Sequence, residues 1–312
     1  MKSFSHDIED YPEGIILNID KPYRWTSADV IRKIKYAAIR HFGKKKLKVG
    51  HAGTLDPLAT GVLLVCIGPA TKRAEELQKH GKEYVAGVSF GATTPSFDLE
   101  KGIDARFPCS HIEKESVEEA LKAFIGEQMQ VAPLFSAKSV DGVRAYELAR
   151  KAFKAGEAIP EGLLKAARIN ISDCELLDFR KSAAGPEAPD FGRNATEQEA
   201  GGAEKRTEGA SFRINVAVDD PELPHAKIRI ACSKGTYIRA FARDLGEALG
   251  SGAYLNSLCR SRSGAFRVED ALTVEQALSL LSVSSEPERL PASTDAARPL
   301  RGPSPEERRP RR

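Results

Sequence analysis

The stretch K-V-G-H-A-G-T-L-D-P-L-A-T-G-V-L occupies residues 48–63 and is the most informative part of this sequence. Its glycines and its Asp-Pro pair predict an irregular loop over residues 50–61, and the apolar run 62–67 predicts a buried strand after it. A residue before proline is pushed away from the helical backbone region, so Asp56 should project from a rigid loop. The nearby glycines would let a large substrate approach closely. An isolated Asp-Pro pair is more often an Asx turn, so its function must be judged from the rest of the chain.

Helices and strands are intermixed on both sides of this loop. One expected helix begins at Thr26, which has capping-box spacing to Asp29, and ends near Gly43; another is expected to be capped by Ser116. The other expected helices cover residues 69–80, 143–155 and 236–249. Strands are expected near residues 14–19, 82–90, 168–179, 212–219, 226–232, 253–259 and 264–268. Because there is no strict βαβ rhythm, this order predicts an α+β fold with a mixed, mostly antiparallel sheet flanked by helices.

One packed body is expected over residues 14–281, after an N-terminal extension at residues 1–13. Residues 181–211 are rich in Gly, Ala, Glu and Pro and predict a disordered insertion between two strands. Residues 282–312 are rich in Pro and Arg and predict a disordered tail rather than a second domain.

Composition argues against several classes of protein. The 47 basic and 44 acidic residues give a net charge of +3, so nucleic-acid binding would have to rest on local clusters, of which the lysines at 44–48 are the densest. No apolar run reaches the roughly 18–20 residues of a membrane span, and the N-terminus lacks the apolar stretch of a secretory signal. The five scattered cysteines form no C-x-x-C pair, which disfavours disulfides and structural zinc and fits a reducing cytoplasm.

Five further segments, together with residues 48–63, give the chain a resemblance to the TruB family, the bacterial tRNA pseudouridine-55 synthases. These segments, which follow the family's order, are G-I-I-L-N-I-D-K-P (14–22), K-E-Y (82–84), Q-V-A-P-L-F-S-A-K-S-V-D-G-V-R-A-Y (130–146), C-S-K-G-T-Y-I-R-A-F-A-R-D-L-G (232–246) and L-C-R (258–260). The resemblance implies a pseudouridine-synthase-type sheet and a catalytic domain over residues 14–281.

The resemblance also implies a reaction, the isomerisation of one uridine of tRNA, expected at position 55 in the T-arm. The base leaves C1′ of its ribose, rotates and rejoins through C5. Asp56 falls on the family's catalytic aspartate, acting either as a nucleophile at C1′ or as a base at C2′. Arg239 is implied as the partner that keeps this carboxylate charged and aimed, and Tyr84 as the ring that stacks on the everted base. Lesser parts in substrate binding are implied for His51, Leu258, Lys21 and Arg260.

The implied partner is the T-arm stem-loop of tRNA, bound mainly through basic side chains near the central loop, and a monomer is expected. No metal and no organic cofactor is needed, because substrate and product are isomers. The chain departs from the family pattern in three places, the first of which is the insertion at residues 181–211. Many relatives carry a C-terminal PUA domain, whereas only the expected tail follows residue 281 here. The run T-T-P-S-F-D at 93–98 keeps Asp98 but lacks the family's first acid, which leaves the role of Asp98 open.

Three other functions compete with this interpretation. A guide-RNA-dependent synthase of the same superfamily is disfavoured by the short chain and the bacterial type of the central string. An inactive RNA-binding or tRNA-folding protein is disfavoured by the presence of Asp56, Tyr84 and Arg239. A glycoside hydrolase using Asp56 and Asp98 as its carboxylate pair would release free base or sugar, which an isomerase does not.

Overall fold

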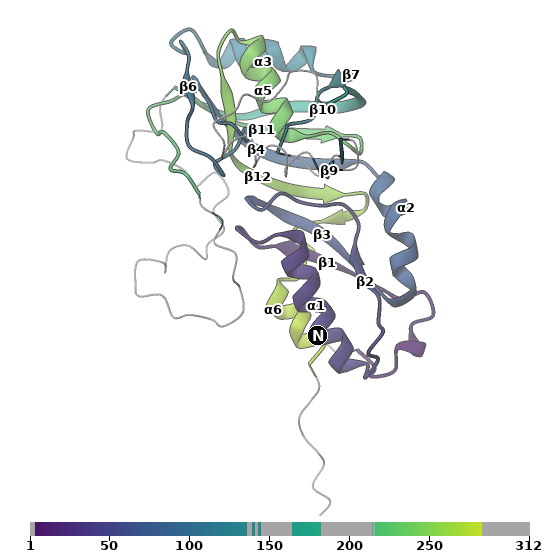
Figure 1. Cartoon of the computed structure of the whole chain (residues 1–312). Coiled ribbons are helices and arrows are strands. Elements are labelled where there is room, and N and C mark those ends of the chain that lie inside the picture. The colour runs from purple at the N-terminus through teal and green to yellow at the C-terminus, as the bar shows by residue number, and fades with distance from the viewer. Residues whose placement is uncertain are drawn as a thin grey trace, which may run out of the picture. The chain divides into compact units, whose positions relative to one another are not determined.

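A nine-stranded sheet runs through the part of the chain described by the computed structural model, residues 4–135, 139–140, 143–144, 164–181, 214 and 216–282 (Figure 1). Its strands are β1 (Ile15–Lys21), β2 (Val49–His51), β3 (Ala59–Ile67), β4 (Lys82–Phe90), β7 (Gly126–Gln130), β10 (Ala167–Arg180), β11 (His225–Cys232), β12 (Ala253–Ser263) and β13 (Phe266–Arg267). The order is β1-β3-β12-β4-β11-β10-β7, with β2 beside β3 and β13 beside β12. Among these strands β3 and β12 form the one parallel pair, so the predicted α+β class with a mostly antiparallel sheet is confirmed.

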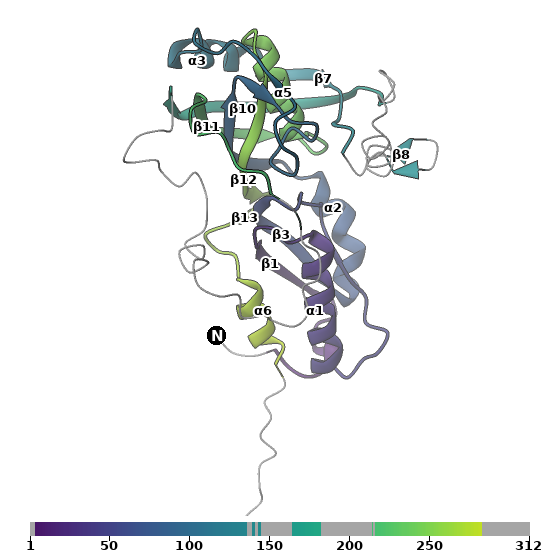
Figure 2. The ribbon, with the colours of Figure 1, turned by 60° about the vertical axis from the view of Figure 1, so that its left-hand side comes forward.

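Helices flank both ends of this sheet (Figures 1 and 2). They are α1 (Ser27–His41), α2 (Ala74–Lys79), α3 (Lys114–Ala123), α5 (Ile238–Ala248) and α6 (Val274–Leu280), with the 3-10 turns η1 (Ile8–Asp10) and η2 (Gly68–Arg73). Two small hairpins are β5 (Ala92–Thr93) with β6 (Ala105–Arg106), and β8 (Ser139–Val140) with β9 (Val143–Arg144). In both views α1 and α6 lie beside β1 and β3, whereas α3 and α5 lie beside β10 and β11.

The core follows the alternation of the strands. Tyr84, Ala86, Val88 and Phe90 share one face of β4 and are all buried, as the sequence predicts. They belong to the same apolar cluster as the inward face of α1 and as Phe241 of α5. Burying a large apolar side chain contributes roughly 1.5–3 kcal/mol, so this shared cluster holds both ends of the sheet in one unit.

The edge of β3 that faces away from β1 changes partner halfway along. Residues 65–67 pair with β2, and residues 59–61 pair with β12. Gly61 has a positive φ of 94°, and a Cβ there would lie 2.3 Å from the carbonyl oxygen of Arg260, so a glycine is needed where β3 and β12 approach. The loop at residues 52–58 joins β2 to β3 at this change of partner, which places Asp56 beside β12.

Several sequence predictions need correction. The loop predicted over 50–61 is shorter, because β2 extends to His51 and β3 begins at Ala59. Residues 214 and 216–219 form no strand, since β11 is already paired with β4 and β10 and offers them no free edge. Ser116 is the third residue of α3 rather than its cap; Glu113 is the N-cap and exchanges hydrogen bonds with it.

The helix that begins at Thr26 is confirmed, with both capping-box hydrogen bonds to Asp29 present. The C-cap of this helix is Phe42, and Gly43 follows with a positive φ, in the left-handed region. In the helix predicted over 143–155, residues 143–144 form β9 and the remainder lies outside the described residues. The predicted insertion, except for Lys181, and the predicted tail, except for Ser282, also lie outside them.

Candidate active site

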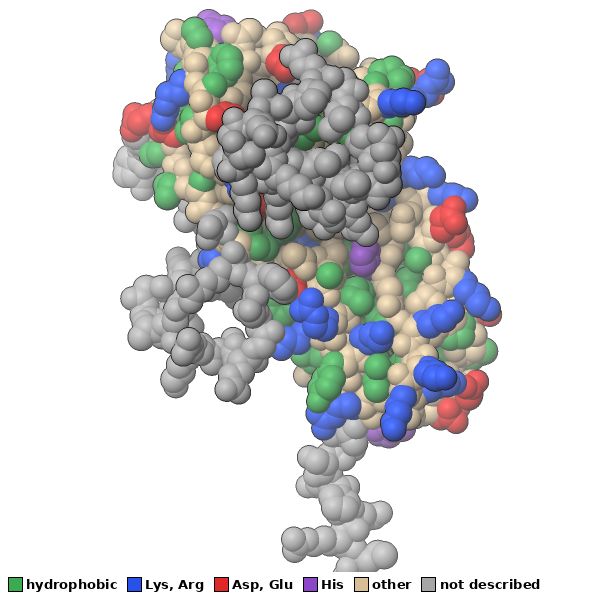
Figure 3. Space-filling view, in the orientation of Figure 1, with side chains coloured by type: hydrophobic (Ala, Val, Ile, Leu, Met, Phe, Trp, Pro, Cys, Tyr) green, Lys and Arg blue, Asp and Glu red, His purple; other side chains and the backbone are tan. Residues whose placement is uncertain are grey.

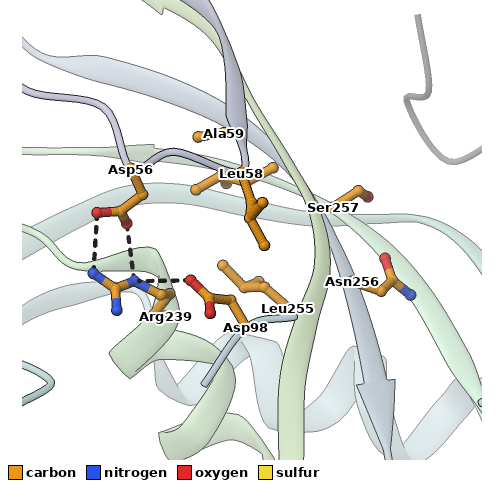
Figure 4. A pocket seen from close by; sticks show the side chains of 9 residues that line it. Asp56, Leu58, Ala59, Asp98, Arg239, Leu255, Asn256 and Ser257 are labelled. Carbon is orange, nitrogen blue, oxygen red and sulfur yellow. Dashed lines mark hydrogen bonds and ion pairs between the residues drawn. The ribbon is translucent and has the colours of Figure 1, made fainter. Parts of the chain in front are cut away.

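Asp56 and Arg239 meet in a two-point ion pair. Nε of Arg239 donates to Oδ2 of Asp56 at 2.9 Å, and Nη2 donates to Oδ1 at 3.0 Å (Figure 4). The guanidinium side chain is 6% exposed and the carboxylate 37%, so the arginine lies in the interior and presents the aspartate at the surface. This fork-to-fork geometry fixes the orientation of the carboxylate as well as its charge.

Two further donors of Arg239 bind backbone carbonyls. Nη1 donates to the carbonyl of Ser96 at 3.1 Å, and Nη2 also donates to that of Phe135 at 2.9 Å. Asp98 lies 3.6 Å from Nε and is 6% exposed. Burial alone would lower the pKa of Arg239, but Asp56 and Asp98 outweigh it and raise that pKa. Burial raises the pKa of Asp98 in spite of the nearby guanidinium.

The start of α5 aims Arg239 at the loop. Tyr237, the N-cap, offers no side-chain cap of its own. The side-chain amide of Gln130 instead holds the backbone of the N-cap residue itself, because its Oε1 accepts from the Tyr237 N–H at 2.9 Å and its Nε2 donates to the Tyr237 carbonyl at 3.2 Å. Gln130 is 4% exposed, so β7 holds the first turn of α5 from the interior.

The residues on either side of Asp56 are held by separate contacts. Oγ of Ser27 donates to the Leu55 carbonyl at 3.2 Å and accepts from the Leu55 N–H at 2.9 Å. Nζ of Lys21, which is fully buried, donates to the carbonyl of Pro57 at 3.1 Å. It also donates to the carbonyls of Pro22 and Trp25, at 2.8 and 2.6 Å. The loop is therefore rigid before any substrate binds.

Burial lowers the pKa of Lys21 to about 7, although the charges of Asp56 and Asp20 oppose the change. The three carbonyl acceptors take up all three N–H donors of the ammonium form. Lys21 is therefore placed beneath the loop, behind Asp56, and is not part of the exposed surface.

A pocket opens beside the ion pair. Its lining residues are Asp56, Leu58, Ala59, Asp98, Arg239, Leu255, Asn256, Ser257 and Leu258. Figure 4 shows Asp56, Arg239 and Asp98 pointing toward one another on one side of β12, whereas the Asn256 side chain points away from them. The pocket therefore has charged side chains at one end, from Asp56, Asp98 and Arg239, and apolar side chains such as Leu58 and Leu258 elsewhere in its wall. This combination suits a ligand that is both polar and flat.

The chain is similar to known proteins over most of its length. The profile of the TruB family pseudouridylate synthase N-terminal domain matches residues 40–188. A protein of Phocaeicola vulgatus named tRNA pseudouridine synthase B is 49% identical over 266 residues, which cover 85% of this chain and 92% of that protein. Its namesake in Bacteroides thetaiotaomicron is 48% identical with the same coverage of both chains.

The chain belongs to the TruB family of pseudouridylate synthases. It is a pseudouridine synthase, an isomerase. A solved Cbf5-Nop10-Gar1 complex has the same fold, with a TM-score of 0.53 and 23% identity over 88% of this chain and 56% of that chain. At this identity the likeness supports the fold alone.

Of two other residues predicted from the TruB resemblance, Leu258 lines the pocket, whereas Tyr84 is not among its lining residues. Leu258 lies on the pocket wall, paired with Ala59 on one side and Ala86 on the other. Tyr84 is 9% exposed, and burial raises its pKa, so its hydroxyl keeps its proton; a hydrogen bond with Arg260 opposes this rise.

His51 ends β2, where the loop begins. Burial and the charge of Arg260 lower its pKa, which keeps the ring neutral. Its Nδ1 atom is buried and has no hydrogen-bond partner within the described residues. A neutral ring with one free nitrogen can stack on a base or accept one hydrogen bond.

Arg260, for which the resemblance implies a part in substrate binding, is buried. It is 2% exposed, and its guanidinium donates to the carbonyl of Val62 at 2.7 Å and to that of Gly53 at 3.1 Å. The side chain therefore ties the catalytic loop to β3 and β12 from within. Lys82 is also buried, and donates to the carbonyls of Gln78 and His80 at the end of α2.

Sequence reasoning missed Ser27 and Gln130 as supports of the site. Ser27 directly follows the capping residue Thr26, so its position at the first turn of α1 was a signal that the sequence offered. Gln130 begins a quoted TruB segment, but nothing local shows that its amide reaches a helix more than 100 residues away.

The described residues contain no group of three or more His, Cys, Asp or Glu side chains that could hold a metal ion. Within the same residues, no helix is both long enough and apolar enough to cross a membrane. All five cysteines are free.

Proposed function

We propose that this chain is a tRNA pseudouridine synthase that isomerises uridine 55 in the T-arm, with Asp56 as its catalytic aspartate. The observation that carries the proposal is the two-point contact between Asp56 and Arg239 at the pocket. A carboxylate that must attack C1′ or remove the C2′ proton has to be ionised and fixed in direction, and this contact supplies both.

Leu258 of the pocket, together with Tyr84 and His51, is proposed to hold an everted nucleotide. Removing a base from its stack costs a few kcal/mol, and stacking on an aromatic ring returns about 1–3 kcal/mol. Tyr84 is the proposed stacking ring, and its protonated hydroxyl is proposed to serve the proton transfer at C5. Leu258 provides an apolar wall for the base, and His51 would fill the space that the base leaves.

Lys21 and Arg260 support this chemistry from behind. Lys21 holds the carbonyl that follows Asp56, and Arg260 holds the carbonyl of Gly53 at the start of the loop. Asp98 shares the guanidinium with Asp56 and helps to keep Arg239 in place. Substrate and product are isomers, so the proposed reaction requires no cofactor.

The relatives' name supports tRNA as the substrate class. The T-arm stem-loop is proposed as the part that is bound, by a monomer acting in the cytoplasm. The five free cysteines fit a reducing compartment. Light scattering of the purified protein tests the monomer, with a mass of 33.9 kDa expected.

The proposed function is tested by tritium release from a tRNA transcript labelled with [5-³H]uridine. One equivalent of tritium per tRNA is expected, because the C5 proton of one uridine is lost when C5 joins C1′. A matched transcript with cytidine at position 55 should release none. Equal release from both transcripts would contradict the T-arm position, and no release from either would contradict the activity.

A further inference from the structure

β12 carries one extra residue beside the pocket. In its pairing with β4, Leu255 lies opposite Val88 and Ser257 lies opposite Gly87, so Asn256 between them has no partner residue on β4. This irregularity is a β-bulge, which bends a strand locally and changes the direction in which its side chains point. The bulge belongs to the site, because all three residues of β12 from 255 to 257 line the pocket.

The bulge brings two leucines to one face of β12. Leu255 and Leu258 are three positions apart, so in a regular strand they would point to opposite faces. Instead Leu255 is a member of the main apolar cluster, Leu258 packs against that cluster, and both line the pocket. Tyr254, which precedes Leu255, lies in a different apolar cluster. The extra residue therefore lets two leucines share the apolar wall of the pocket.

The bulge also lies between two contacts that hold the carboxylates of the site. On the edge of β12 that faces away from β4, the N–H of Leu255 donates to the carbonyl of Phe97 at 3.0 Å, next to Asp98. On the same edge Leu258 pairs with the first residue of β3, where the loop that carries Asp56 ends. The course of β12 between these two contacts therefore sets how far apart Asp56 and Asp98 are held.

A buried polar network holds Asn256 on the side of β12 away from the ion pair (Figure 4). Its Nδ2 donates to Oγ of Ser89 at 2.9 Å, and that Oγ donates to Oδ1 of Asp219 at 3.0 Å. The same oxygen of Asp219 accepts from the Tyr254 hydroxyl at 2.6 Å, and Oδ2 lies 3.0 Å from Nε2 of His225. Burial alone would raise the pKa of Asp219, but the hydrogen bonds from His225, Tyr254 and Ser89 outweigh it and lower that pKa. An ionised Asp219 is a strong acceptor, so Ser89 is well fixed.

Gly87 leaves the room that the bulge needs. A Cβ at this position would lie 2.0 Å from Oδ1 of Asn256 and 2.3 Å from Oγ of Ser257. Oδ1 of Asn256 is buried without a hydrogen-bond partner in the described part of the chain, so the contact of Nδ2 with Ser89 is what orients this amide. Loss of that contact should free the bulge.

We propose that Asn256 is a positioning residue for the isomerisation. Its amide fixes the bulge of β12, and the bulge sets both the apolar wall of the pocket and the spacing of the two carboxylates. Asn256 touches no reacting atom, because its side chain points away from the ion pair (Figure 4). The inference rests on the proposed function, since the everted uridine that the wall holds is that function's substrate.

The test compares Asn256→Ala with a matched control, Asn18→Ala. Asn18 is also an asparagine of a sheet strand, β1, and its Nδ2 donates to the Arg267 carbonyl at 2.7 Å. Its Oδ1, like that of Asn256, is buried without a partner among the described residues. Single-turnover tritium release at saturating tRNA gives the rate, and filter binding gives the dissociation constant. Hydrogen exchange of the backbone amides at 254–258 reports on the bulge in the absence of RNA.

Asn256→Ala should lower the single-turnover rate about 10- to 100-fold, because a misplacement of about 1 Å at a reacting centre can cost roughly 100-fold. Its dissociation constant for tRNA should stay within about threefold of the wild type. The Lys and Arg side chains that gather on the lower half of the face in Figure 3 are untouched by the substitution. Amide exchange at the bulge should be faster than in the wild type. Asn18→Ala should leave the rate within about twofold and the exchange at 254–258 unchanged.

The contact with Ser89 provides a second arm. Ser89→Ala leaves the Asn256 amide without its acceptor and should lower the rate by a similar factor. The double variant should lose no more than the larger single loss, because both changes remove the same contact. Ser89→Thr keeps the hydroxyl and should keep the rate. If Asn256→Ala does not fold, Ser89→Ala and Ser89→Thr carry the same test.

A rate of Asn256→Ala within twofold of the wild type would overturn the proposal, and so would equal rate losses in Asn256→Ala and Asn18→Ala. Losses that multiply in the double variant, or unchanged amide exchange at the bulge, would also overturn it. Failure of the proposed function gives a different result. In that case the wild type itself releases no tritium from uridine 55, while amide exchange at 254–258 still separates Asn256→Ala from the control.

Discussion

Replacing Arg239 by Met should destabilise the protein strongly at neutral pH, and less at acidic pH. The variant keeps the length of the side chain but removes every donor, so Asp98 loses its cation while only 6% exposed. Breaking a buried ion pair in this way costs about 3–5 kcal/mol. The loss of stabilisation at Asp56 adds less, because that side chain is 37% exposed and solvent replaces the guanidinium.

The pH dependence follows from Asp98. Burial already raises its pKa in the wild type, and loss of the guanidinium raises it further. A carboxyl whose pKa is raised in the folded state is protonated in both states below its unfolded pKa of about 3.9, so its burial costs no ionisation there. As pH rises from that value to the folded pKa, the free energy of unfolding falls. The deficit of the variant relative to the wild type should therefore shrink by about 1.4 kcal/mol for each pH unit below the variant's folded pKa, down to the folded pKa that Asp98 has in the wild type.

Urea unfolding at pH 5 and pH 8 measures this effect, with Asp98→Asn as the second arm. Adding Asp98→Asn to Arg239→Met should recover part of the lost stability at pH 8 and little at pH 5. A loss under 1 kcal/mol at pH 8, or an identical loss at both pH values, would refute the assignment of Arg239 and Asp98 as a buried charged pair.

Three further predictions concern the surroundings of the pair. Lys21→Met should lower the single-turnover rate at least tenfold through loss of the Pro57 contact. Because burial lowers the pKa of Lys21 to about 7, the wild type should also gain stability as pH rises from 7 to 10, and chemical unfolding of the variant should lack this gain. Tyr84→Phe keeps the ring, so tRNA affinity should stay within about threefold while the rate falls; a rate equal to the wild type would exclude the hydroxyl from proton transfer. Gly61→Ala should lower the free energy of unfolding in urea by about 2–4 kcal/mol, because its Cβ would lie 2.3 Å from the Arg260 carbonyl oxygen. The control Gly43→Ala, which has open space around it, should lower it by about 1 kcal/mol. Similar losses in the two variants would count against the close approach of β3 and β12.

The sequence predicted the elements whose signals are local. The capping box at Thr26, the alternation in β4 and the apolar run of β3 each need only a short window, and each is present in the structure. The fold class followed from their order. The strand predicted at 212–219, which is absent at the described residues 214 and 216–219, came from the same reasoning. A strand also requires a free edge, and that depends on which strands have already paired.

The sequence predicted that Asp56 and Arg239 form a pair, but it did not predict the side chains that hold them in place. The resemblance to the TruB segments implied that Arg239 is the partner of Asp56, and in the structure the two residues, 183 positions apart, are hydrogen-bonded. The resemblance implied a part in substrate binding for Arg260, but its side chain is buried. That burial depends on the carbonyls of Gly53 and Val62, which no sequence pattern reveals. The same holds for Gln130, whose partner is a backbone group.

The most direct test of the account is a single-turnover assay of Asp56→Asn with [5-³H]uridine-labelled tRNA at saturating concentration, alongside a binding measurement. The amide is close in shape to the carboxylate but can neither attack C1′ nor remove a proton. The account predicts tRNA affinity within about fivefold of the wild type and no tritium release above background. Release of one equivalent by the variant at a rate near that of the wild type would contradict it.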